Sequence, residues 1–381
     1  FRMESKSRQK ILSELQMKGV DRQTALEAWE EMEELMEPDE RAVLRKTIEK
    51  KYAPDTELDE GQMRRLYGYL ARRAFKYEDI SHILECAGLI HDIGNPPFGH
   101  FGELAIRDWF VRKLPELHYK RQTLDMILSP QMKEDFYHFE GNAQALRLVT
   151  RLHYLVDEYG MNLTYALLNT IIKYPVSSTQ VHPDSGNIRE KKMGYFLADE
   201  KIFEEITQET KTGNCRHPLT YILEAADDLA YKTADIEDAF VKGFITYHSL
   251  RDELRKLQNR QKKLTVPEQA EWNRFRPADK LVELYERAKK NGVDNPGDYA
   301  VKNWIVKAQG VLIGYATSGF TSHYDEIMNG VYKTDLFADT PAEGLVKLLG
   351  EIACKCVFKS ETIYRMEVKE AVMLDNLMDR F

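Results

Sequence analysis

The chain has 381 residues, of which 43% are hydrophobic and 30% charged, and it carries a formal net charge of −8 at pH 7. This length predicts one large domain or two modest ones, and the composition is typical of a globular protein with a sizeable core. The negative charge argues against a protein that coats nucleic acid, but an anionic substrate needs only a local positive pocket. No apolar stretch approaches the roughly 20 residues of a membrane span and no signal-peptide pattern is recognised, so we expect no membrane contact.

Four cysteines, Cys86, Cys215, Cys354 and Cys356, are spread unevenly along the chain. Their spacing gives neither a disulfide framework nor a pair of Cys-x-x-Cys knuckles. We therefore expect free thiols in a reducing cytoplasm.

Long helical patterns dominate the sequence, and no convincing run of alternating strand residues is present, so we predict an all-α fold. In chain order the pattern predicts a helical hairpin over 3–18 and 21–37, a linker over 53–60, helices over 61–76, 78–93, 102–113 and 139–158, a loop over 174–194, a helix over 219–240 and further helices from 250 onward. We divide the chain into an unassigned N-terminal helical segment (1–60), a core (61–250) and a C-terminal helical region (251–381).

A basic stretch begins the C-terminal region and is followed by Trp272 and Phe275 among further arginines. Its basic residues are Arg251, Arg255, Lys256, Arg260, Lys262 and Lys263. Basic residues interleaved with aromatic ones are one way to bind single-stranded nucleic acid. An exposed helix with ordinary solvated charges explains the same pattern, and we favour that interpretation.

The most informative motif is an adjacent His91-Asp92 pair at the end of an apolar run over 83–90. The break over 94–97, Gly-Asn-Pro-Pro, forbids continuation of the helix. Such a helix can present two metal ligands where the backbone turns. Each piece also has an ordinary explanation, as solvated polar residues followed by a turn.

His100 and Glu103 follow this break with the spacing of a first helical turn. This pattern indicates an acid/base pair that faces the metal ligands. A His-Asp pair that closes an apolar helix, followed by a second polar pair, favours function over chance.

A second constellation lies on the helix predicted over 219–240, which carries Glu224, Asp227, Asp228, Tyr231 and Asp235. Positions 227, 231 and 235 share one helical face, where carboxylates repel one another unless a cation or donors compensate them. A carboxylate from this helix could complete a His/Asp metal site. An exposed acidic stripe is the alternative, and this segment alone does not decide between them.

These residues together resemble the HD-domain deoxynucleoside triphosphate triphosphohydrolases, particularly the bacterial dGTPases. The resemblance rests on His91-Asp92 with its loop and on residues 224–231, and stretches at 138–144, 172–175 and 192–196 strengthen it. It covers about residues 78–250 and continues weakly to near 365.

The resemblance implies an all-α metallohydrolase that splits dGTP or other dNTPs into deoxynucleoside and inorganic tripolyphosphate. The family's metal ligands carry over to His91, Asp92 and Asp227, its catalytic histidine to His100 and the acidic residue that orients it to Glu103. Mixed nitrogen and oxygen ligation suits Mn or Mg, and also Co or Fe.

The resemblance also implies a substrate site and an assembly. Tyr231 and Asp235 match positions that hold the deoxyribose, and Lys173 and Tyr174 match contacts on the phosphate side. A lysine there suits a triphosphate as a point charge. Relatives commonly form multimers, so we expect a homo-oligomer.

The chain departs from the family at one metal ligand. The family uses four protein ligands, the first a histidine some tens of residues before the HD pair, but this chain has no histidine before His82. His82 lies nine residues ahead of His91 on the same expected helix, too near for that role. Either that segment is absent from this sequence or residues around 40–65 have diverged.

Two other functional classes stay open. One is a different HD phosphohydrolase that acts on nucleoside monophosphates, cyclic nucleotides or guanosine polyphosphates. The other is a nucleotide sensor without catalysis, in which the missing histidine indicates a metal site that has lost its function.

Overall fold

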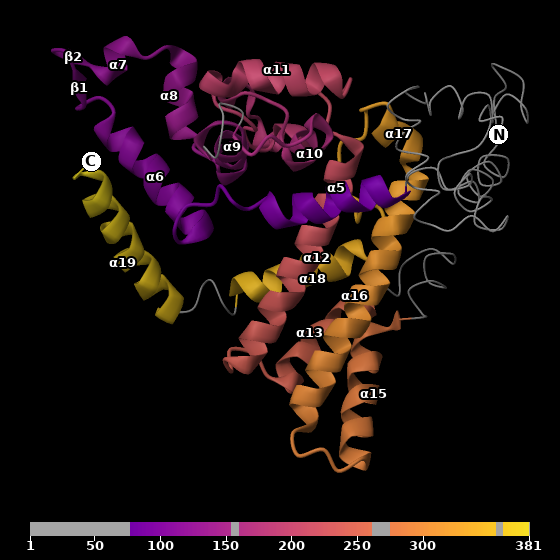
Figure 1. Cartoon of the computed structure of the whole chain (residues 1–381). Coiled ribbons are helices and arrows are strands. Elements are labelled where there is room, and N and C mark those ends of the chain that lie inside the picture. The colour runs from indigo at the N-terminus through magenta and orange to yellow at the C-terminus, as the bar shows by residue number, and fades with distance from the viewer. Residues whose placement is uncertain (1–76, 154–159, 261–274, 356–360, 381) are drawn as a thin grey trace, which may run out of the picture. The chain divides into compact units, whose positions relative to one another are not determined.

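The computed structural model describes residues 77–153, 160–260, 275–355 and 361–380 (Figure 1). The helices expected over 3–18, 21–37 and 61–76, the linker over 53–60, and Cys356 lie outside these ranges. The chain divides into two compact units between His82 and Ile83. Only residues 77–82 of the first unit are described, as the first turns of a helix, and the rest of the description concerns the second unit.

The first half of the described chain contains helices joined by short turns and one small hairpin. These elements are α5 (Tyr77–Ile90), α6 (Gly99–Lys113), β1 (His118–Tyr119), β2 (Gln122–Thr123), α7 (Leu124–Ile127), α8 (Pro130–Tyr137), α9 (Gly141–Arg147), the π-helical turn η1 (Leu148–Leu152) and α10 (Tyr165–Ile171). The strands β1 and β2 pair antiparallel over two residues each. Residues 139–153, expected to form one continuous helix, contain a loop, α9 and the π turn.

The loop expected over 174–194 has no long helix, and its backbone makes four single turns up to residue 199. They are η2 (Ser178–Gln180), η3 (Pro183–Ser185), η4 (Ile188–Glu190) and η5 (Leu197–Asp199), and α11 (Glu200–Glu209) follows directly. The buried carboxylate of Asp135 on α8 accepts hydrogen bonds from the Ser178 hydroxyl at 2.6 Å and the Leu197 N–H at 2.7 Å. One carboxylate therefore fixes both ends of this segment.

The second half is built from longer helices. They are α12 (Pro218–Val241), α13 (Tyr247–Arg260), α15 (Pro277–Lys290), α16 (Pro296–Ser322), α17 (Tyr324–Met328), α18 (Glu343–Ala353) and α19 (Glu361–Met378). Helix α12 begins where the sequence predicts, because Pro218 suits a first helical position and the His217 side chain caps the helix by accepting from the Leu219 N–H.

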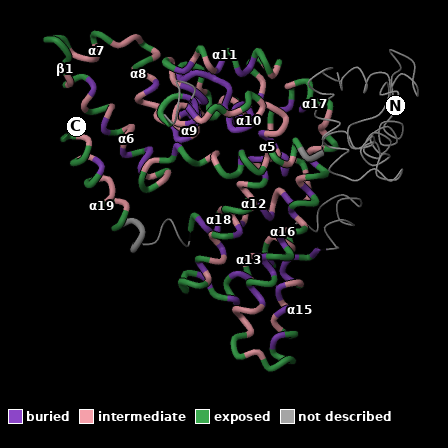
Figure 2. Tube along the Cα trace, in the orientation of Figure 1, coloured by how far each residue is buried: buried purple, intermediate pink, exposed green. Residues whose placement is uncertain are grey.

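Two apolar clusters, purple in Figure 2, form the interior of the second unit. One joins α5, α9, α10 and α11 and includes Leu223 of α12. The other joins α12, α13, α15, α16 and α18 around the fully buried Trp304. Because α12 contributes Leu223 to one cluster and Tyr221 and Ala225 to the other, its first turns are packed from two sides, which makes this part of the helix a rigid support for side chains.

The C-terminal helix α19 packs on α6. The Trp109 indole N–H donates to Asp379 at 2.8 Å, and the Arg112 guanidinium binds both carboxylate oxygens of Asp375, at 2.8 and 2.9 Å. Segments 270 and 263 residues apart in sequence are thus joined.

The expected all-α class is confirmed for the described residues, where the two-residue hairpin is the only strand pairing. The helices expected over 78–93, 102–113 and 219–240 are present with boundaries shifted by a few residues. The division at residues 60 and 250 stays a prediction. None of the described helices has both the length and the apolar character needed to cross a membrane.

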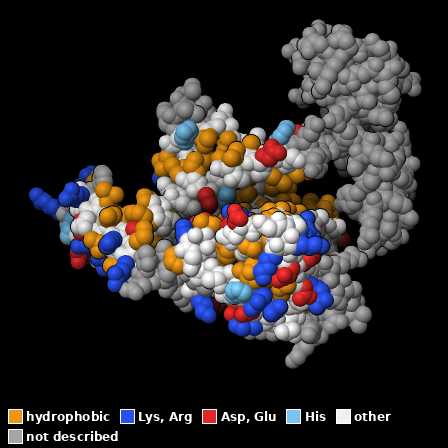
Figure 3. Space-filling model, turned by 90° about the horizontal axis from the view of Figure 1, so that it is seen from below, with side chains coloured by type: hydrophobic (Ala, Val, Ile, Leu, Met, Phe, Trp, Pro, Cys, Tyr) orange, Lys and Arg blue, Asp and Glu red, His pale blue; other side chains and the backbone are white. Residues whose placement is uncertain are grey.

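Basic and acidic side chains are interspersed on the face seen in Figure 3. In the predicted basic stretch, Arg251 pairs with Asp252 at 2.7 Å and Lys256 with Glu253 at 2.6 Å. Part of that stretch, from 261 to 274, lies outside the described residues. Nucleic-acid binding stays an untested expectation.

Candidate active site

The HD pair lies where α5 ends. The His91 N–H still donates to the Ala87 carbonyl, as in a last helical turn, and the chain then turns toward α6. A Cβ added at Gly94 would lie 2.1 Å from both the Gly141 carbonyl oxygen and the Ala145 nitrogen. The loop therefore lies directly against the start of α9, and only glycine fits at position 94.

The His91 ring is held with one nitrogen fixed and the other available. Its Nδ1 lies 2.9 Å from the Gly88 carbonyl oxygen, which can only accept, so Nδ1 carries the proton. In the neutral imidazole, Nε2 then has the free lone pair. This atom is buried without a hydrogen-bond partner, which is the arrangement of a metal-ligating histidine.

Two carboxylates face this nitrogen. Asp227 Oδ1 lies 3.2 Å and Asp92 Oδ2 3.5 Å from His91 Nε2. The other oxygen of Asp227 accepts from the ammonium of Lys173, a buried lysine, at 2.7 Å. The contact with Asp227 raises the pKa of His91, against the opposing effect of burial. Burial would raise the pKa of Asp227, but His91 and Lys173 hold it well below its usual range.

One ligand atom from each of His91, Asp92 and Asp227 lies within 4.8 Å of the others, which makes them a group that could hold a metal ion. An imidazole nitrogen and two carboxylate oxygens fit a divalent cation of intermediate or hard character. The structure thus brings together three residues of which the first and last, His91 and Asp227, lie 136 positions apart in the sequence. The exposed His82 does not belong to this group.

His100 and Glu103 form the second pair expected from sequence. His100 Nδ1 lies 3.0 Å from Glu103 Oε2, and the His100 ring is largely exposed while Glu103 is buried. A carboxylate only accepts, so Nδ1 donates and Nε2 faces outward. The Gly141 N–H donates to the other oxygen of Glu103 at 2.8 Å. Burial would raise the pKa of Glu103, but the contacts with His100, Lys192 and Gly141 lower it.

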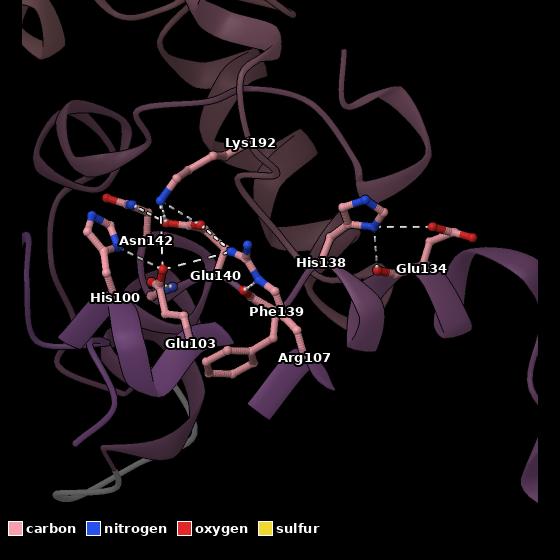
Figure 4. Close-up of polar contacts among 10 residues, drawn as sticks. His100, Glu103, Arg107, Glu134, His138, Phe139, Glu140, Asn142 and Lys192 are labelled. Atoms are coloured by element: carbon pink, nitrogen blue, oxygen red, sulfur yellow. Dashed lines mark hydrogen bonds and ion pairs between the residues drawn. The ribbon is translucent and has the colours of Figure 1, made fainter. Parts of the chain in front are cut away.

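Sequence reasoning missed the charged residues behind this pair. Glu140, which is completely buried, contacts Arg107 and Lys192 at 3.0 and 2.9 Å. Figure 4 shows these side chains beside His100 and Glu103. Residues 138–144 and 192–196 were noted for their resemblance, but their spacing gave no sign that Glu140 and Lys192 meet.

Tyr231 and Asp235, expected on the sugar side, lie one turn apart on α12. Partial burial and the neighbouring Asp235 raise the pKa of Tyr231 to about 12. Tyr174, by contrast, is buried, and burial with the charge of Glu224 raises its pKa. Among the described contacts, none joins His100 directly to the His91 group.

Glu224, singled out in sequence, does not belong to the His91 group. Its carboxylate pairs with the buried guanidinium of Arg216 at 2.7 Å. His138, which opens a matched stretch, pairs with Glu134 at 3.1 Å, apart from Glu103 (Figure 4). Glu224 and His138 therefore each have a charged partner that belongs neither to the His91 group nor to the His100–Glu103 pair.

Comparison with known proteins gives a consistent set of relatives. A deoxyguanosinetriphosphate triphosphohydrolase-like protein of Listeria monocytogenes is 42% identical over 305 residues, which cover 80% of this chain and 62% of the relative. A deoxyguanosinetriphosphate triphosphohydrolase of Yersinia enterocolitica is 34% identical over 321 residues, 78% of this chain and 60% of the relative. Over these residues the chain is similar to proteins named deoxyguanosinetriphosphate triphosphohydrolase or deoxyguanosinetriphosphate triphosphohydrolase-like.

A third relative carries a similar name. A probable deoxyguanosinetriphosphate triphosphohydrolase of Pseudomonas aeruginosa is 32% identical over 311 residues, 79% of this chain and 60% of the relative. No protein-family model matches the chain. The chain spans about three fifths of the length of the curated relatives it matches.

Proposed function

We propose that this chain hydrolyses dGTP, or dNTPs more widely, to deoxynucleoside and inorganic tripolyphosphate with the help of a divalent cation. The observation that carries the proposal is the orientation of His91. Its Nδ1 is fixed by the Gly88 carbonyl, and its buried Nε2 faces the carboxylates of Asp92 and Asp227. The names of the relatives supply the substrate class.

His91, Asp92 and Asp227 would hold the cation, with Mn²⁺ and Mg²⁺ as the first candidates and Co²⁺ or Fe²⁺ as further ones. When bound by these residues, a divalent cation would supply Lewis acidity toward a phosphoryl oxygen and toward water.

His100 acts as general acid toward the 5′-oxygen that leaves when the α-phosphorus is attacked. Its Nδ1 is held by Glu103, so that the exposed Nε2 can carry a proton to substrate. Glu103 stays ionised in this arrangement because its pKa is held low. Ionised Glu103 fixes the tautomer and stabilises the imidazolium before the proton is given up.

Four residues bind the nucleotide. Lys173 and Tyr174 serve the triphosphate, Lys173 as a positive charge and Tyr174 as a hydroxyl donor that burial keeps protonated. Tyr231 and Asp235 serve the deoxyribose, where the tyrosine ring excludes a 2′-hydroxyl and the carboxylate accepts from the 3′-hydroxyl.

Product analysis tests the proposal. The protein is incubated with dGTP and Mn²⁺ or Mg²⁺, and nucleosides and phosphates are resolved by ion-exchange chromatography. We expect deoxyguanosine and tripolyphosphate from the unchanged protein, and none from His91→Ala or Asp227→Ala. His118→Ala, on the exposed β1 strand, is the matched control and should retain activity.

Other products would point to other classes. Release of dGMP or orthophosphate would assign the chain to a different HD phosphohydrolase. A folded protein that binds Mn²⁺ and dGTP without turnover would be a nucleotide sensor. Either result would overturn the proposed reaction.

A further inference from the structure

Glu140 is the most deeply buried carboxylate near His100. It precedes α9, has no exposed side-chain surface, and accepts from three donors. The donors are Arg107 at 3.0 Å, Lys192 at 2.9 Å and the side-chain amide of Asn142 at 2.7 Å (Figure 4). A completely buried charge is tolerated only with such compensation.

The two cations that bind Glu140 also face Glu103, at a greater distance. Arg107 Nη2 and Lys192 Nζ each lie 3.8 Å from Glu103 Oε2, the oxygen that His100 Nδ1 approaches to 3.0 Å. The charges of these two carboxylates and two cations therefore sum to zero when His100 is neutral. The distances show which contacts prevail, because both cations are hydrogen-bonded to Glu140 and neither is bonded to Glu103.

We propose that Glu140 is a positioning residue for His100, which acts by holding Arg107 and Lys192 away from Glu103 Oε2. This inference rests on the proposed role of His100. Without the charge on Glu140, the guanidinium and the ammonium turn to Glu103 and compete with His100 for the same oxygen. His100 then loses its fixed orientation, and the excess positive charge disfavours the imidazolium.

This arrangement predicts opposite effects for opposite charges. Glu140→Gln leaves the cluster more positive, so the protonated imidazole of His100 is disfavoured and the alkaline limb of the kcat profile moves to lower pH. Arg107→Gln leaves the cluster more negative, so the limb moves to higher pH. Each shift should be about 1 to 2 pH units, as expected for a unit charge about 7 Å away at an effective dielectric constant near 20.

The test compares kcat against pH for the Mn²⁺-loaded full chain with dGTP. The variants are Glu140→Gln, Arg107→Gln and the double variant, in which neutrality is restored and the limb should return toward its original position. Glu134→Gln is the matched control, because Glu134 pairs with His138 nearby but has no described contact with Glu103. It should leave the limb in place.

A second readout keeps this inference separate from the proposed function. The ring signals of ¹⁵N-histidine-labelled protein, with His100 assigned from a His100→Gln sample, report the titration midpoint of the imidazole without any turnover. If the wild-type protein hydrolyses no dNTP, the proposed function fails. The titration midpoint of His100 must still fall in Glu140→Gln and rise in Arg107→Gln. Should Glu140→Gln not fold, Lys192→Met must raise the midpoint by itself.

A purely structural role for Glu140 gives a different result. Activity and stability would fall, but neither the limb nor the midpoint would move, or both charge variants would shift them in the same direction. Either outcome overturns the assignment.

Discussion

The ammonium of Lys173 lies 2.7 Å from Asp227 Oδ2, while Oδ1 of the same carboxylate lies 3.2 Å from His91 Nε2. Lys173 is buried, so its charge is weakly screened and acts mainly on Asp227. One carboxylate thus joins a positive side chain to the group that could hold a metal ion. A cation that binds there must share Asp227 with a lysine.

Lys173→Met should therefore bind Mn²⁺ more tightly but turn over dGTP less well. Loss of the ammonium removes a repulsive charge, and we expect an affinity gain of about tenfold in isothermal titration calorimetry. The KM for dGTP should rise, because a phosphate contact is lost. Lys191→Met, an exposed neighbour of Lys192, should change neither quantity. Weaker Mn²⁺ binding in Lys173→Met would contradict this account.

Cation binding should weaken on acidification. Only a neutral imidazole ligates a metal, and the contact with Asp227 raises the pKa of His91 above the ordinary 6.5 despite burial. Mn²⁺ affinity should thus fall as pH decreases through a midpoint above 6.5. In the cation-free protein the sign is reversed, since the protonated His91 with Asp227 stabilises the fold at low pH and ceases to do so as pH rises through the raised pKa.

Calorimetric titrations with Mn²⁺ at constant ionic strength, in small pH steps, check the midpoint. Asp92→Asn serves as a comparison, because loss of its charge should move the midpoint down. An affinity that stays constant down to about pH 6 would show that His91 does not titrate in this way.

Glu224 should matter for stability and not for the metal. Glu224→Gln leaves the Arg216 guanidinium buried without its charged partner, which costs about 3–5 kcal/mol for a broken buried ion pair. Urea unfolding measures the loss, and the double variant Arg216→Met with Glu224→Gln should be more stable than Glu224→Gln alone. Mn²⁺ binding should persist in the folded fraction. A change below about 0.5 kcal/mol would refute the pairing.

Gly141 should tolerate no side chain. A Cβ there would lie 2.3 Å from Asn95 Oδ1 and 2.8 Å from Glu103 Oε1, so the HD loop and the His100 pair would both be displaced. We expect Gly141→Ala to lose about 1–3 kcal/mol of stability and most of its activity. Gly310→Ala in α16 meets nothing within 4 Å and should be neutral or stabilising by about 0.5–1 kcal/mol. Equal behaviour of the two variants would contradict the packing described.

Much of this site follows from sequence, because its parts are local. The apolar run before His91, the Pro96-Pro97 break and the spacing of His100 and Glu103 each report a helix end or a first turn. Helix α12 could also be predicted from local sequence. Pro218 suits the start of the helix, and the periodic apolar residues of the helix mark its buried face. The convergence of Asp227 on His91 was expected from resemblance and not from spacing.

Residues that act through tertiary contacts could not be predicted from local sequence patterns. Glu140 and Lys192 lie 52 positions apart and carry no shared periodicity. Lys173 was expected beside phosphate, yet here it donates to Asp227, because a buried ammonium takes the nearest carboxylate. Glu224 looked like a member of the acidic stripe, but Arg216, eight residues earlier, takes its charge.

Hydrolysis of dGTP in H₂¹⁸O with Mn²⁺ tests the central claim most directly. Mass spectrometry of the products should show deoxyguanosine and tripolyphosphate in equal amounts, with one ¹⁸O in the tripolyphosphate and none in the nucleoside, and His91→Ala should yield neither. Label in the deoxyguanosine, or release of dGMP or orthophosphate, would contradict attack on the α-phosphorus at this site.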